Sequence, residues 1–139
     1  MQTSLRYPPL ADYAGRFATD TVVLVRGRTG YELDFSVGSL RLADQAMEGF
    51  RREGRPVAEV AETLVGFGAY VGEVLVRQAQ ARWVDFSPHE RALFGHAFGV
   101  RTPDGQVWNP LGKAFKRYAN GMEHSLYLFC VGAAGDAHT

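Results

Sequence analysis

Two long stretches of the chain place apolar residues at the three- and four-residue spacing of an α-helix. The first begins near Ser36 or Ser39, either of which can serve as the N-terminal cap, and continues to Glu53. The second begins at Pro56 and continues to about Gln80. Three glycines interrupt the second stretch at Gly66, Gly68 and Gly72. Because each glycine costs helix stability, we expect another element to pack closely against them.

Other segments carry β-branched and aromatic residues bounded by turn-forming residues, which favours β-strands. Thr21–Val25 and Tyr31–Phe35 predict a hairpin around a loop that contains two glycines. Arg82–Phe86 predicts a further strand, and Phe94–Val100 and Gln106–Trp108 predict a second hairpin around a Thr-Pro-Asp-Gly turn. These segments together indicate a mainly antiparallel sheet of four to five strands.

The C-terminal third predicts one more main helix, which Asn109 caps and Pro110 begins. Its apolar stripe consists of Leu111, Ala114, Phe115 and Tyr118. The apolar run Ser125–Val131 fits either a buried helix or a strand, and residues 132–139 are expected to form a flexible tail. The predicted fold is therefore a single α+β domain over residues 1–131, in which the sheet packs with about three main helices.

The charge balance narrows the classes of partner. Fifteen Lys and Arg residues match fifteen Asp and Glu residues, which argues against nucleic acid as a partner.

No apolar stretch approaches the roughly 20 residues of a membrane-spanning helix, and the N-terminus lacks the apolar region of a signal peptide. Cys130 is the single cysteine, so an intrachain disulfide is impossible and a buried thiol is expected. We therefore expect a cytoplasmic protein that makes no membrane contact.

Three segments also occur together in a recognisable order. They are Leu33-Asp34-Phe35-Ser36 with the helix that contains Leu40, then Gly68-Ala69-Tyr70-Val71-Gly72-Glu73-Val74-Leu75 followed by Trp83, and Asn109-Pro110 followed by Lys113, Lys116-Arg117, Asn120-Gly121 and Ser125-Leu126. Over about residues 33–131 the chain resembles a group of small bacterial proteins of unknown function that are common in actinobacterial genomes. The resemblance implies no reaction. Some small α+β proteins of this general type are partner-binding or immunity-type proteins, which is an analogy of size and class.

The helix that follows Asn109 is the best candidate for a recognition surface. Residues 107–121 contain three cations and no acid. The candidate contact residues, expected on the face opposite the apolar stripe, are Trp108, Lys113, Lys116, Arg117 and Asn120. This pattern favours a non-catalytic module that binds an acidic protein partner, and the analogy above implies an immunity or regulatory type. The alternative for these cations is a solvated face near the negative end of the helix dipole.

A small enzyme is the second hypothesis. Glu73 lies among apolar neighbours and would act as a partly buried general base, with His124, Tyr70 or Trp83 near a pocket. The alternative for Glu73 is an ion pair with Arg77, four residues later on the same helix. The four histidines lack HExxH spacing, so we expect neither a metal nor a cofactor.

Overall fold

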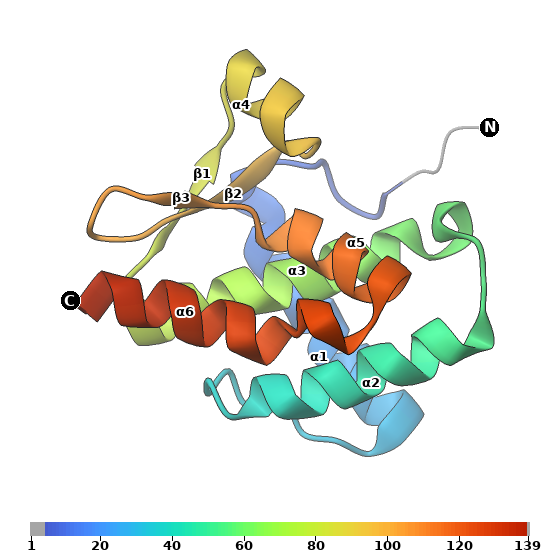
Figure 1. Ribbon diagram of the computed structural model, residues 1–139. Helices are drawn as coiled ribbons and strands as arrows, with labels where there is room; N and C mark the ends of the chain where they lie inside the picture. Colours follow the sequence, from blue (N-terminus) through green and yellow to red (C-terminus); the bar gives the residue numbers. More distant parts are fainter. Residues whose placement is uncertain (1–4, 139) are drawn as a thin grey trace.

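Helix α3 (Val57–Ala79) forms the centre of the protein in a computed structural model, which describes residues 5–138 (Figure 1). Helices α1 (Ala14–Thr29), α5 (Pro110–Asn120) and α6 (Leu126–His138) pack against α3, and α2 (Ser39–Glu53) packs against α5 and α6. The largest fully buried side chains of α3 are Leu64, Phe67, Tyr70, Val71, Val74 and Leu75. The core is thus built around one helix rather than on the face of a large sheet.

The sheet has three short antiparallel strands in the order β1-β2-β3. These are β1 (Arg82–Asp85), β2 (Phe98–Arg101) and β3 (Val107–Trp108). Helix α4 (Pro88–Phe94) connects β1 to β2 and protrudes from the sheet (Figure 1). Two single turns of 3-10 helix, η1 (Ala11–Tyr13) and η2 (Met122–His124), precede α1 and α6. The mixture of helix and antiparallel strand agrees with the prediction, but four to five strands were too many.

Two predicted strands, Thr21–Val25 and Tyr31–Phe35, are not strands in the structure. Thr21–Val25 lies inside helix α1, and the residues after Gly30 have no regular structure before α2. In α1, Phe17, Thr21 and Val25 are four residues apart and all face the core. The Thr21 hydroxyl donates to the Phe17 carbonyl oxygen at 3.0 Å, so its polar group is satisfied within the helix. Burial of this helical stripe against α3 outweighs the modest strand preference of β-branched residues.

The glycines of α3 do allow close packing, as expected. A Cβ atom at Gly68 would lie 2.6 Å from the Leu111 Cα atom of α5, and one at Gly72 would lie 2.1 Å from the Trp83 ring. A Cβ at Gly66 would lie 2.3 Å from the Thr21 hydroxyl oxygen of α1. Three different elements therefore approach the α3 backbone where side chains are absent.

The predicted cap at Asn109 is confirmed, whereas the N-terminal cap of α2 is Gly38 rather than Ser36 or Ser39. Gly54 ends α2 in the left-handed conformation, and Ser87 begins α4 with a capping box that includes Glu90. The Asn109 side chain accepts a hydrogen bond from the Gly112 amide at 3.0 Å and so caps α5. None of the described helices is long and apolar enough to cross a membrane.

The apolar run that follows Ser125 is a helix rather than a strand. Helix α6 extends through His138, so the segment expected as a tail is helical up to that residue, and Ala133 within it is buried. The flexibility of this end stays a prediction, and Thr139 lies outside the described residues. Cys130 is fully buried in α6, as expected, and burial raises the pKa of its thiol to about 12.

Candidate binding surface on helices α5 and α6

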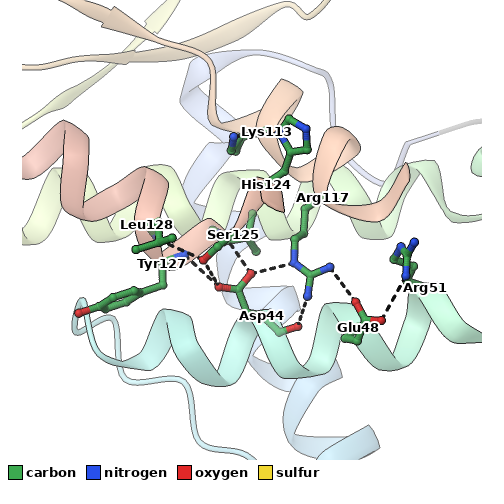
Figure 2. A network of polar contacts seen from close by, with 10 residues as sticks. Asp44, Glu48, Arg51, Lys113, Arg117, His124, Ser125, Tyr127 and Leu128 are labelled. Atoms are coloured by element: carbon green, nitrogen blue, oxygen red, sulfur yellow. Dashed lines mark hydrogen bonds and ion pairs between the residues drawn. The ribbon is translucent and has the colours of Figure 1, made fainter. Parts of the chain in front are cut away.

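Arg117 is not part of an exposed surface, which corrects its place in the predicted contact set. Its side chain is fully buried between α5 and α2. The guanidinium donates from Nε to Asp44 Oδ1 at 3.0 Å, from Nη2 to the Asp44 carbonyl oxygen at 3.0 Å, and from Nη1 to Glu48 Oε1 at 2.9 Å (Figure 2). Arg117 therefore joins α5 to α2 from inside the protein and is unavailable to a partner.

Asp44 also holds the first turn of α6. Its carboxylate accepts hydrogen bonds from the backbone amides of Leu126, at 2.9 Å, and Tyr127, at 3.1 Å (Figure 2). The Ser125 hydroxyl donates to Asp44 Oδ2 at 2.8 Å and accepts from the Leu128 amide at 3.2 Å. The amides at a helix N-terminus lack partners within the helix and carry partial positive charge, so a carboxylate stabilises them. The buried pair thus positions three helices, α2, α5 and α6, with respect to one another.

Glu48 extends this network toward solvent. It lies one turn after Asp44 on α2, and its second carboxylate oxygen accepts from Arg51 Nη1 at 3.2 Å. The hydrogen bond from Arg117 is the main reason that the pKa of Glu48 is held below its usual value of 4.5. Glu48 is therefore negatively charged at neutral pH, where it supplies the second negative partner of the buried guanidinium.

Asp44, Glu48 and Ser125 were absent from the predicted site. The sequence nevertheless indicates the buried pair of Asp44 and Arg117. Asp44 follows Leu40 by four residues and precedes Met47 by three, so it falls on the apolar stripe of α2. Arg117 follows Ala114 by three residues and falls on the buried stripe of α5. Charged residues are rarely buried without a partner, so opposite charges on two apolar stripes indicate a buried pair.

The other predicted contact residues do lie at the surface. Lys116 and Asn120 are exposed on α5, and Lys113 and Trp108 are half-buried. Lys113 Nζ lies 3.1 Å from His124 Nδ1 (Figure 2). Partial burial, and then the charge of Lys116, lower the pKa of Lys113. The structure thus joins Lys113 to His124, a contact between α5 and η2 that the sequence did not predict.

Trp108 connects this region to α6. Its indole N–H donates to the Thr102 hydroxyl at 2.9 Å, so that hydrogen bond stays inside the hairpin. The Trp108 ring meets the Phe129 ring edge to face at a centroid distance of 5.9 Å. Trp108 is therefore a packing contact between β3 and α6 as well as a part of the half-exposed surface.

The outer side of α6 is unusually apolar for a surface helix. Leu128 is 65% exposed and Val131 is 40% exposed, and Met122 in the preceding turn is 55% exposed. On the α2 side, Arg41 donates to the Tyr127 hydroxyl at 3.0 Å and lies over the Tyr127 ring, 4.4 Å from its centroid. Exposed apolar groups that are bordered by polar and charged residues are typical of protein interaction sites.

Of the residues predicted near Glu73, Trp83 is the one with a hydrogen bond to it among the described side chains. Glu73 accepts from Trp83 Nε1 at 2.8 Å and pairs with Arg77 at 3.4 Å, so each carboxylate oxygen already has a partner. The ion pair with Arg77 is the structural alternative that the sequence offered. The Tyr70 hydroxyl contacts the Phe35 amide and the Ser39 hydroxyl, whereas His124 contacts Lys113. The structure thus joins Trp83 to Glu73, whereas the hydrogen bonds of Tyr70 and His124 go to other residues.

No family model, curated protein or solved structure matches the chain. Among the side chains that the structure describes, His, Cys, Asp and Glu do not form a group of three or more that could hold a metal ion. The surface of α5, η2 and α6 is consequently the feature from which we infer a function.

Proposed function

We propose that the protein is a non-catalytic module that binds an acidic protein partner through α5, η2 and α6. One observation carries the proposal, namely the exposed apolar side of α6 between cations on two neighbouring helices. Lys113 and Lys116 lie on α5, and Arg41 lies on α2. Among the side chains of residues 5–135, no carboxylate forms an ion pair with any of these three cations.

The chemistry of this surface favours an acidic partner with an apolar centre. Leu128 and Val131 would be buried by the partner, and burial of apolar area supplies most of the affinity in protein association. The surrounding cations would pair with carboxylates and speed association. Glu123 is exposed in η2, directly after Met122. The charge of this surface is therefore positive but not uniform. The contact set is Trp108, Lys113, Lys116, Asn120, Met122, Leu128 and Val131.

The buried network explains how a rigid surface arises in so small a protein. Asp44 and Arg117 fix α5 and α6 on α2, so the exposed side chains are held on elements that do not need to be ordered on binding. Rigid presentation lowers the entropy cost of association. Arg117 therefore supports the surface without touching the partner.

Capture of a partner from a cell lysate, followed by affinity measurement with matched variants, tests this proposal. We expect Lys116→Glu and Leu128→Asp each to weaken binding about tenfold, because one reverses a rim charge and the other places a charge in the apolar centre. Arg26→Glu and Val23→Asp, both on α1, are the matched controls, since both positions are highly exposed and lie outside the contact set and outside the buried network. The controls are expected to bind as the wild type does.

Salt dependence and a membrane control complete the test. Binding is expected to weaken between about 0.01 M and about 0.15 M salt, over which screening of exposed charges increases strongly. Equal capture by wild type, Lys116→Glu and Leu128→Asp would remove this surface from consideration. Sedimentation with vesicles that contain phosphatidylserine, lost in the same two variants, would instead assign the surface to a membrane and overturn the protein partner.

An enzyme with Glu73 as general base stays a prediction without a supporting geometry. Trp83 and Arg77 occupy the two Glu73 oxygens, as described above. A base that must accept a proton from a substrate needs an available lone pair aimed at that substrate. No contact of Glu73 favours this second function over binding.

A further inference from the structure

Arg82 and Arg101 face each other across the first two strands of the sheet. They are Cα partners in the antiparallel pair β1–β2, so their side chains leave the same face of the sheet side by side. Like charges directly opposite each other destabilise a strand pair. A negative charge beside the two guanidinium groups would offset this repulsion.

Within residues 5–135, no acidic side chain compensates these two charges. Among the side chains of residues 5–135, neither Arg82 nor Arg101 forms an ion pair, and Arg101 Nη1 donates instead to the Gly105 carbonyl oxygen at 3.0 Å. The nearest acids along the chain are engaged elsewhere. Asp85 accepts from the Ala11 amide at 2.7 Å, and Asp104 Oδ1 accepts from the Thr102 hydroxyl and the Gln106 amide within the turn.

The two arginines also point away from the protein core. Trp83 and Val100 form the next pair in the register, and they pack inward, where the Trp83 ring lies against Gly72 of α3. Because side chains alternate along a strand, Arg82 and Arg101 lie on the opposite, solvent side of the sheet. There they line a shallow depression of about 330 Å³ together with Gln80, Thr102, Pro103 and Gly105.

We propose that this depression, defined by Arg82 and Arg101, binds a phosphate group of a small molecule. Arg101 donates to Gly105 from Nη1 alone, so the two guanidinium forks still present several N–H donors, which match the several acceptor oxygens of a phosphate dianion better than the two oxygens of a carboxylate. Gln80 also lines the depression and carries an amide group that can donate hydrogen bonds. The Thr102 hydroxyl is already used by Asp104 and Trp108, so recognition falls to the arginines. This site is independent of the α5–α6 surface.

Calorimetric titration of the full chain with inorganic phosphate, at constant ionic strength, tests the site. We expect one phosphate per chain, and at least about tenfold weaker binding in Arg82→Gln and in Arg101→Gln, because each removes charge-assisted hydrogen bonds. Arg52→Gln is the matched control, since Arg52 is 80% exposed on α2 and its loss changes the net charge equally. Titration with glycerol 3-phosphate distinguishes an esterified from a free phosphate group.

Thermal unfolding gives a second readout that separates binding from folding. In phosphate-free buffer, Arg82→Gln is expected to melt no lower than the wild type, because it removes the cross-strand repulsion. Added phosphate should raise the melting temperature of the wild type and Arg52→Gln but not that of Arg82→Gln. Unchanged phosphate affinity in Arg82→Gln, equal weakening in Arg52→Gln, or equally tight binding of acetate would each overturn the proposal.

Discussion

Arg117 satisfies its buried guanidinium with three acceptors on one neighbouring helix. Two of them belong to Asp44 and one to Glu48, and the planar fork reaches all three at once. A lysine at this position would present a single ammonium group and could not reproduce this pattern. The same Asp44 carboxylate caps α6, so one residue serves both an ion pair and a helix terminus.

Removal of the guanidinium should therefore be costly. We predict that Arg117→Met lowers the free energy of unfolding by about 3–5 kcal/mol, because Asp44 is left as a buried charge without its partner. Urea denaturation followed by circular dichroism measures the effect. Arg52→Met, at an exposed position, is expected to change stability by less than about 0.5 kcal/mol. A cost of the same small size in Arg117→Met would show that the pair contributes little to stability.

At the scale of the elements, close approach to α3 decides which substitutions a helix tolerates. Gly68 and Gly49 are both helical glycines, but their surroundings differ. A Cβ atom at Gly68 would meet the α5 backbone, whereas a Cβ atom at Gly49 on α2 would meet nothing within 4 Å. In the unfolded chain, both glycines have the same extra conformational freedom, and both lose it when the helix forms. Contacts in the folded protein therefore determine the sign of a change to alanine.

The two glycines predict opposite outcomes for the same substitution. Gly49→Ala should raise the free energy of unfolding by about 0.4–1 kcal/mol, because alanine reduces the entropy of the unfolded chain without a clash. Gly68→Ala should lower it by about 1–3 kcal/mol, because the new methyl group overlaps the Leu111 backbone and forces α5 outward. Denaturant titration of both variants checks this contrast. Stabilisation by Gly68→Ala would contradict the close packing of α3 and α5.

For the whole molecule, the network around Arg117 makes stability depend on acidity. The pKa of Glu48 is lower in the folded protein than the usual 4.5, so the unfolded chain binds a proton first as the pH falls. The free energy of unfolding that this group contributes is therefore present above its unfolded pKa and is lost as the pH falls through the folded pKa.

Glu48→Gln provides the test of this dependence. The variant should be less stable than the wild type near neutral pH, and the difference should shrink as the pH is lowered from about 5 to about 3. Urea denaturation over that range, with both proteins in the same buffers, gives the comparison. A difference that stays constant with pH would mean that the charge of Glu48 is not what stabilises the fold.

Local rules were sufficient for several elements of the fold. The apolar stripes of α2, α3 and α5, the capping box at Ser87 and the left-handed glycine at Gly54 all depend on residues within a few positions of each other. The glycines of α3 even indicated that neighbours would approach closely. The cations of α5 and the ion pair of Glu73 with Arg77 could also be predicted from residues that are close in sequence.

Long-range packing decided the rest. Thr21–Val25 has local strand preference, but it folds as a helix because Phe17, Thr21 and Val25 can then be buried together against α3. Arg117 was predicted as a surface cation, and although its position on the buried stripe of α5 indicates burial, its partner Asp44, 73 residues away, is identified only by the packing of α5 on α2. The sequence alone determined where α2, α3 and α5 and several turns lie, because those depend on neighbouring residues. Which charges are buried, and which remain to meet a partner, depended on contacts between distant helices that only the tertiary structure brings together.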